Sequence, residues 1–443
     1  MAILGNELLK KLEAKYESNL NNKIIENAIF KNGIKASSTN NQVVRKHDFQ
    51  FSVEVKPGSI TNQKHSGRCW IFAELNAARA KVMKDLNIED LEFSQNFIHF
   101  YDKLEKANAY LTWIATTGLE LDNEDRLFRR YNENPISDGG YFEFFLNIAS
   151  KYGIVPKSAM PESFHSEATN DMVEQINWRL KAYTFRMREA YKKNHNMSEV
   201  EAIRQHALED VYNILVKSLG MPPKTFIFEY YDKDKKFVRL PEMTPIKFFE
   251  TYIKQFVENK VDVISDPREI YPYYIQLVAP SVFNSVGGIE YKMLNIPMNE
   301  LKAAAIKQLQ SGQSIWFGCD VTTFYSKEGI FDTKLYDYDL TLTETPKEFN
   351  KKEKFESRAS VISHAMNLIG VNLDEKGNPI NWKVENSWGT EVGKKGYWSM
   401  SDSWFEEYVY MLIVDKEFLS KEAIEGLSKE AIEISPYDPL CEE

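Results

Sequence analysis

The hydrophobic pattern of this chain changes character once along its length, and that change limits the folds open to it. Up to about residue 300, apolar residues recur mostly at helical spacing, in amphipathic stretches with recognisable caps. Beyond that point the pattern is β-rich, with glycine turns between short runs of aromatic and β-branched residues. Helices first and strands afterwards predict an α+β protein with two lobes.

Composition narrows the class of protein further. The chain has 443 residues, 43% of them hydrophobic, which is enough apolar material for a large core, and a net charge of −10, which argues against broad nucleic-acid binding. No run approaches the roughly 18 apolar residues of a membrane span, and the N-terminus lacks the features of a secretory signal. Three cysteines cannot form a disulfide framework, and so few suit a reducing compartment. We therefore expect a cytoplasmic globular protein.

Changes in composition along the chain suggest how it is organised. Residues 170–220 are charged, amphipathic and free of proline, and Ser198 with Glu201 fits a capping box. A hairpin is expected around Asp232, and a short helix with a repeated KEAIE near the C-terminus. We expect an N-terminal helix and arm (1–45), a helical lobe that contains Cys69 (46–160) and a mostly helical insertion (161–300). A β-rich lobe that contains His364 and Asn386 (301–418) and a C-terminal helix and tail (419–443) are expected to follow.

Cys69 is the strongest candidate for chemistry. Ser66 and Gly67 lie just before an apolar helical repeat, so the helix is expected to begin close to Cys69. A helix N-terminus favours a thiolate because its unpaired N–H groups and its dipole stabilise negative charge. A buried cysteine at a helix start is more often a small packing residue, and a catalytic role requires a base and an oxyanion donor elsewhere.

Those further groups are present in other blocks of the chain. His364 opens an apolar strand, where an imidazole can face a cleft, and Asn386 can hold its tautomer. Trp388 can shield that hydrogen bond from water and is a candidate to line the substrate site. Gln63 can offer its amide to a developing oxyanion beside the backbone N–H of Cys69. Together with Cys69, the residues His364, Asn386 and Gln63 favour acyl transfer through a thioester.

These blocks resemble the papain-like cysteine peptidases. QKHSGRCWIFA, SHAMNLIG and VENSWG follow the family order of Gln, Cys-Trp, His and Asn-Ser-Trp-Gly, and Ser66 stands where secreted members carry a second cysteine. The resemblance implies a two-lobed papain-like fold, with Gly139 and Gly140 as a strip that admits the substrate backbone; a plain turn is the alternative for this pair. It implies no cofactor and no metal.

The spacing points to one branch of that family. About 300 residues separate Cys69 from His364, against about 130–150 in papain-type chains, and the excess matches the helical insertion. A papain core with such an insertion resembles the bleomycin hydrolase and aminopeptidase C branch. That resemblance implies an intracellular homohexamer acting on peptides, in which the terminal carboxylate, here that of Glu443, pairs with the substrate amine.

The end of the chain leaves the specificity open. The branch commonly ends in a small apolar tail, whereas this chain ends Leu-Cys-Glu-Glu. A shorter tail with two extra carboxylates would either leave the cleft open, as in an oligopeptide endopeptidase, or strengthen amine capture, as in an aminopeptidase. Cys441 is expected to be exposed and incidental, and Cys319 to be a packing residue.

Two other classes of function compete with the peptidase. A non-catalytic binding protein on the same scaffold would be expected to have lost some of the four candidate residues. A metalloenzyme would need ligand motifs such as H-E-x-x-H or paired C-x-x-C, and the sequence contains neither. An aminopeptidase-type cysteine peptidase is the leading prediction.

Overall fold

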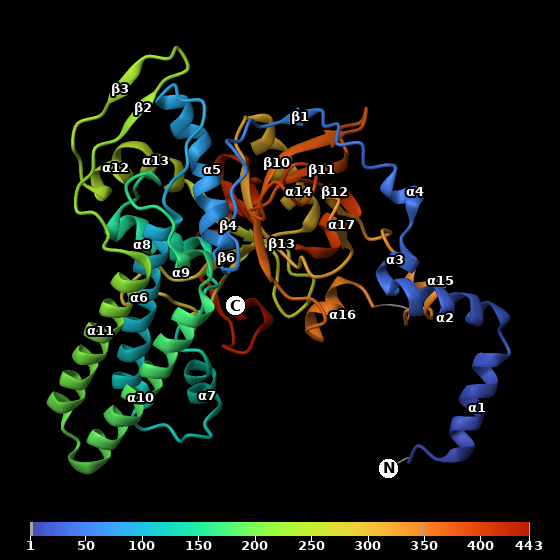
Figure 1. The fold of residues 1–443 in the computed structure, drawn as a ribbon, viewed down its shortest axis with the longest axis horizontal. Coiled ribbons are helices and arrows are strands. Elements are labelled where there is room, and N and C mark those ends of the chain that lie inside the picture. The colour runs from blue at the N-terminus through green and yellow to red at the C-terminus, as the bar shows by residue number, and fades with distance from the viewer. Residues whose placement is uncertain (1–2, 347–348, 443) are drawn as a thin grey trace.

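The computed structural model describes residues 3–346 and 349–442, and helix α5 (Cys69–Asp85) runs through its middle (Figure 1). The predicted apolar face of α5, which includes Ile71, Leu75 and Val82, is buried, and so are the residues between Ile71 and Leu75. The helix is enclosed because helices pack on one side of it and strand β10 on the other. The helical lobe also contains α6 (Gln95–Trp113) with its π-helical continuation η1 (Ile114–Gly118), α7 (Arg126–Glu133), α8 (Phe142–Tyr152) and α9 (Phe164–Glu167).

The second lobe is built on a mixed sheet, with twelve strands within the described residues. Its order is β14-β5-β6-β4-β13-β7-β10-β11-β12-β9-β8, and β1 pairs antiparallel with β10. The first four strands of this order are β14 (Ile432–Glu433), β5 (Ile275–Val278), β6 (Lys292–Asn295) and β4 (Lys260–Ile264). The sheet includes β1 (Val53–Glu54), β7 (Ile315–Cys319), β8 (Tyr325–Ser326), β9 (Ile330–Phe331), β10 (His364–Leu373), β11 (Pro379–Glu385), β12 (Tyr397–Ser401) and β13 (Val409–Asp415). Helices α14 (Met298–Gln310), α15 (Tyr338–Thr341), α16 (Lys351–Glu356) and α17 (Asp402–Tyr408) accompany it.

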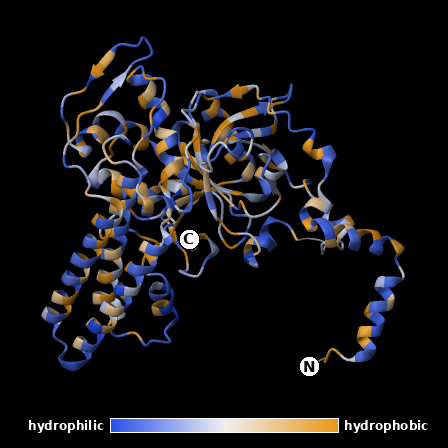
Figure 2. Ribbon diagram, viewed as in Figure 1, coloured by the Kyte–Doolittle hydropathy of each residue, from blue (hydrophilic) through white to orange (hydrophobic). Residues whose placement is uncertain are grey.

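The sheet separates two apolar cores. Along β13, Met411 and Ile413 pack into the core of the helical lobe, whereas Leu412 and Val414 pack into a second core on the other face. This alternation follows from the two-residue period of a strand, and burial on both faces explains why the strand is continuously apolar. Figure 2 shows the hydrophobic residues concentrated in these central strands. The predicted α+β fold with a helical and a β-rich lobe is confirmed.

Two long helices extend from the helical lobe (Figure 1). They are α10 (Asn170–Asn194) and α11 (Met197–Leu219), which pack along each other and correspond to the charged amphipathic stretches of the sequence. The hairpin expected around Asp232 is present as β2 (Glu229–Tyr231) and β3 (Phe237–Arg239), and α12 (Pro245–Tyr252) and α13 (Lys254–Val257) follow.

Residues 260–296 differ from the mostly helical segment expected over 161–300. They form β4 (Lys260–Ile264), β5 (Ile275–Val278) and β6 (Lys292–Asn295), and β4 pairs antiparallel with β13 in the main sheet. These strands are short, and β4 finds its partner about 150 residues further along the chain, so local periodicity carries little sign of them.

The two ends of the chain also differ in detail from the prediction. The N-terminal arm contains α1 (Asn6–Glu17), α2 (Leu20–Asn32), α3 (Ile34–Ser38) and α4 (Asn41–Val44) rather than a single helix. At the other end, the first KEAIE copy is helical but the second forms a strand, because Ile432 and Glu433 pair with β5. The C-terminal elements are η2 (Lys416–Phe418), α18 (Lys421–Gly426), β14 (Ile432–Glu433) and η3 (Pro439–Cys441).

Candidate active site

Cys69 is the first residue of α5, as the sequence predicts, and it is partly buried at the junction of the two lobes. Burial raises the pKa of the Cys69 thiol, and hydrogen bonds from the backbone of Ala365, Trp70 and Cys69 itself work against that rise. Since Ala365 directly follows His364, the start of β10 lies against the thiol. The packing of α5 on β10 therefore brings together two residues that are far apart in the sequence.

His364 is buried and held by two neighbours. Its Nε2 lies 2.9 Å from Oδ1 of Asn386, and its ring lies 4.9 Å from that of Trp388, centroid to centroid. Burial lowers the pKa of His364 to about 4, although the hydrogen bond with Asn386 favours the charged ring. Asn386 is placed by the end of β11, which pairs with β10 along its length.

Gln63 connects the loop before Cys69 to the segment that follows Asn386. Its Nε2 donates to the carbonyl oxygen of Ser66 at 2.6 Å, and its Oε1 accepts from Oγ of Ser387 at 2.6 Å. Its backbone N–H donates to the carbonyl of Ser387 at 2.8 Å. The contacts with Ser387, which sequence analysis did not single out, connect Gln63 to the residue after Asn386. The position of Ser387 within the Asn-Ser-Trp-Gly block is the signal that could have found it.

Gly139 and Gly140 lie beside the start of α5. The indole N–H of Trp70 donates to the carbonyl of Asp138 at 2.8 Å, and a Cβ on Gly140 would lie 2.6 Å from that indole. Packing against Trp70 is therefore a sufficient reason for glycine at this position, independent of any substrate. The carbonyl of Gly139 accepts a hydrogen bond from Lys106.

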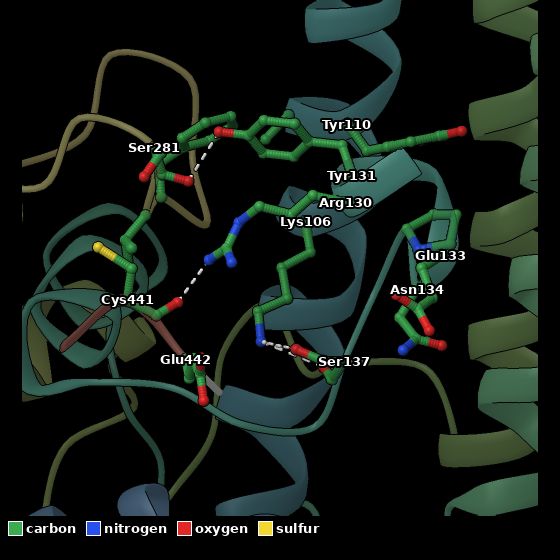
Figure 3. Close-up of a pocket in the computed structure, with 14 residues that line it drawn as sticks. Lys106, Tyr110, Arg130, Tyr131, Glu133, Asn134, Ser137, Ser281, Cys441 and Glu442 are labelled. Carbon is green, nitrogen blue, oxygen red and sulfur yellow. Dashed lines mark hydrogen bonds between the residues drawn. The ribbon is translucent and has the colours of Figure 1, made fainter. Parts of the chain in front are cut away.

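The C-terminal tail lies beside this strip, and Figure 3 shows its last described residues at a cavity of about 410 Å³. Arg130 donates to the carbonyl of Cys441 at 2.5 Å, and the hydroxyl of Tyr141 donates to the carbonyl of Glu442 at 2.7 Å. Cys441 is only 1% exposed, so the expectation that it is exposed is wrong; the packing of η3 into the helical core covers it. Glu443, predicted to meet the substrate amine, lies outside the described residues.

Neither a metal cluster nor a membrane-crossing helix is found in the described parts of the chain, 3–346 and 349–442. No group of three or more His, Cys, Asp or Glu side chains there is placed to hold a metal ion. Among the same residues, every helix is too short or too polar to cross a bilayer.

Comparison with known proteins decides the family. A family model described as the Peptidase C1-like family matches residues 3–441. The chain belongs to this family. It is therefore a cysteine peptidase.

Relatives of this C1-like peptidase cover nearly its whole length. Aminopeptidase C of Listeria monocytogenes is 38% identical over 98% of this chain and 97% of its own. Human bleomycin hydrolase is 37% identical over 89% of this chain and 88% of its own. Among solved structures, PepW from a Lactobacillus rhamnosus strain matches with a TM-score of 0.96 and 34% identity, over 99% of both chains.

Proposed function

We propose that this C1-like peptidase is an aminopeptidase that releases residues from the N-terminus of peptides. The observation that carries the proposal is the path of the tail: Tyr141, next to the glycine strip, fixes the carbonyl of Glu442. A tail anchored there would block a long substrate, and the carboxylate at the end of the chain would attract an α-ammonium group. The names of the relatives, aminopeptidase C and bleomycin hydrolase, support the same class.

The proposed chemistry uses Cys69 as nucleophile and His364 as base. Because Nε2 of His364 faces Asn386, Nδ1 is the nitrogen that would take the thiol proton. The sulfur then attacks the peptide carbonyl carbon, and the oxyanion is stabilised by the amide of Gln63 and the backbone N–H of Cys69. His364 returns the proton to the leaving amine, and water hydrolyses the thioester by the same path in reverse.

Two substrates test the specificity. A dipeptide substrate with a free amine is expected to turn over much faster than its N-acylated form, because only the free amine can pair with the tail. Equal turnover would reject the aminopeptidase and favour the endopeptidase, whose supporting observation is the two-glutamate ending of this chain. Cys69→Ala is expected to abolish hydrolysis of both substrates while the protein stays folded; retained activity would reject the nucleophile itself.

We also propose that the protein is a cytoplasmic homohexamer that does not bind nucleic acid. An assembly is supported by the N-terminal arm, whose helix α1 has no buried residue and carries several exposed leucines. A reducing compartment suits the three cysteines, which are all free thiols. The net charge of −10 opposes binding to a polyanion. Light scattering at several protein concentrations tests the assembly.

A further inference from the structure

Asp138 makes contacts that tie the glycine strip to the loop before the nucleophile. Its Oδ2 accepts a hydrogen bond from the backbone N–H of Gly67 at 3.1 Å and another from the hydroxyl of Thr169. Its Oδ1 lies 3.1 Å from Nζ of Lys103, and its carbonyl accepts from the indole of Trp70. One residue thus contacts elements on both sides of the candidate nucleophile.

The contact with Gly67 is close enough to define the loop. A Cβ built on Gly67 would lie 2.6 Å from Cβ of Asp138, so the aspartate is packed directly on the glycine. The loop around Gly67 in turn holds Gln63, because Gln63 donates to the carbonyl of Ser66 and the hydroxyl of Ser66 donates to the carbonyl of Gln63, both at 2.6 Å. Because the Gln63 amide is held by Ser66 on one side and by Ser387 on the other, a shift of Gly67 would disturb one of its two anchors.

Charge strengthens this tie. Lys103 is completely buried, and its ammonium lies between Asp138 and Asp102, which is 3.2 Å away. Burial alone would raise the pKa of Asp138, but Lys103 and the donors around the carboxylate outweigh it and hold that pKa well below its usual range. The acceptor facing Gly67 is therefore an anion at neutral pH, and charge-assisted hydrogen bonds are the stronger kind.

No covalent bond links the loop to the strip. All three cysteines of this chain are free thiols, so no disulfide holds the loop. The ion network around Asp138 is what the described residues offer in its place.

We infer that Asp138 is a positioning residue for the acyl-transfer step, which holds the amide of Gln63 where the oxyanion forms. The inference rests on the proposed roles of Gln63 and Cys69. An oxyanion donor acts only in the transition state, so misplacing it lowers kcat and leaves KM nearly unchanged. Alkylation of Cys69 by iodoacetamide forms no oxyanion, so its rate reports the thiol and the histidine alone.

The experiment compares kcat with the alkylation rate in the full-length protein. Asp138→Ala is expected to lower kcat about 10- to 100-fold per titrated active site on the free-amine dipeptide, and to change the alkylation rate less than about twofold. Asp138→Asn, which keeps one acceptor but no charge, is expected to lie between this variant and the parent. Asp102→Asn is the matched control, because Asp102 also faces Lys103 but does not contact Gly67; its kcat is expected to stay near that of the parent.

A double mutant tests whether Asp138 acts through Gln63. If it does, Asp138→Ala adds little to the loss caused by Gln63→Ala, because the donor is already gone. Full additivity of the two losses would overturn the inference, as would kcat and the alkylation rate falling in parallel, or a kcat for Asp138→Ala within twofold of the parent.

A second pair of variants keeps the inference testable if Asp138→Ala does not fold. If Asp138→Ala does not fold, Thr169→Val and Thr169→Ser remove and keep the second donor to the same oxygen, and only the valine variant is expected to lose kcat with the alkylation rate intact. Equal kcat for those two variants would then reject the inference. Failure of the proposed function has a different signature, because Cys69→Ala would then keep its activity. Failure of the inference alone leaves Cys69→Ala inactive and Asp138→Ala as active as the parent.

Discussion

At the scale of single residues, His364 is shaped by two opposing effects. Burial under Trp388 favours the neutral ring, and the hydrogen bond to Asn386 favours the charged one; burial dominates and lowers the pKa to about 4. The base proposed here, His364, can act only while it is unprotonated. The acid limb of kcat/KM is therefore expected near pH 4, well below the ordinary value for histidine.

The pH profile of kcat/KM between pH 3.5 and 8 checks this expectation. Activity should be lost as the pH falls through about 4, where the ring becomes charged and can no longer accept the thiol proton. Asn386→Ala removes the interaction that favours the charged ring, so its acid limb is expected to move to still lower pH, together with a lower kcat from the misplaced ring. An acid limb near pH 6.5 in the parent would contradict the dominance of burial.

The three thiols are expected to differ in reactivity. Burial raises the pKa of all three thiols, to about 11 for Cys441, but only Cys69 is partly exposed and so accessible to a reagent. Iodoacetamide should therefore label one thiol per chain in the native protein at pH 7, and mass spectrometry of peptides should locate the label at Cys69. Cys69→Ala is expected to take up no label until it is unfolded. Labelling of Cys441 in the native protein would show that the tail opens.

The candidate residues could be predicted from sequence because each belongs to a short block with its own chemistry. These blocks identify Cys69, His364 and Asn386 as the candidates for the chemistry. Such chemistry does not mark Ser387 or Asp138, because their contacts with Gln63 and Gly67 join residues about 320 and 70 positions apart, and no local pattern encodes such a contact. Gly140 was selected for substrate approach, whereas its closest contact is with Trp70.

At the scale of elements, the C-terminal tail is held by several charged contacts. Arg268 forms a bidentate pair with Asp438 at 2.9 and 3.1 Å, and Arg130 donates to the carbonyl of Cys441 at 2.5 Å. Arg130→Ala should loosen the last residues while leaving the rest of the tail anchored at Asp438. We expect the turnover of the N-acylated dipeptide to rise relative to that of the free amine, because the side of the cleft that the tail is proposed to block becomes accessible.

Arg129→Ala provides the matched control for that prediction. Arg129 lies on the same short helix but is exposed and pairs with Glu124 at 3.3 Å, away from the tail. Its ratio of N-acylated to free-amine turnover should equal that of the parent. An unchanged ratio in Arg130→Ala as well would indicate that the tail does not set the specificity.

The elements that sequence predicted well are those with strong local signals. Helix α5, the charged pair α10 and α11 and the hairpin near Asp232 each carry periodicity or turn residues that suffice alone. Strand β14 shows the opposite case, because its KEAIE sequence repeats that of α18 and becomes a strand only through pairing with β5. Tertiary pairing overrides a weak helical preference over so few residues.

At the scale of the whole molecule, buried carboxyl groups lie where the two lobes meet. Glu74 on α5, Glu143 on α8 and Asp262 on β4 are all buried, and within the described residues no side chain or backbone group hydrogen-bonds to either oxygen of Glu74 or Asp262. Burial raises the pKa of Glu74 to about 7 and that of Glu143 to about 8, and it raises the pKa of Asp262. The folded protein therefore binds protons more tightly here than the unfolded chain.

Because the folded state binds these protons more tightly, the protein is expected to become less stable as the pH rises. Between about pH 4.5 and 8 the folded state holds a proton on Glu143 that the unfolded state has lost, so the free energy of unfolding falls as the pH rises, by up to about 1.4 kcal/mol per pH unit for one group. Glu143→Gln should reduce that slope, and the exposed Glu133→Gln should not. Urea denaturation at pH 5.5 and 8 measures the slope; equal slopes in the parent and Glu143→Gln would contradict the expectation.

The N-terminal arm offers a surface for the assembly proposed above. Helix α1 lies away from the two lobes (Figure 1), and Leu8, Leu9, Leu12 and Tyr16 fall on one face of it, each at least 39% exposed. Exposing an apolar stripe to water costs free energy, and a second copy of the chain that covered the stripe would remove this cost.

Replacing the three leucines by serine should therefore lower the mass of the assembly measured by light scattering, whereas Lys10→Ser with Glu17→Ser, on the opposite face, should leave it unchanged. The circular dichroism of both variants should match that of the parent, because α1 contributes no residue to the core. If the leucine variant kept the mass of the parent, contacts elsewhere on the molecule would have to hold the copies together, and the arm would need another partner.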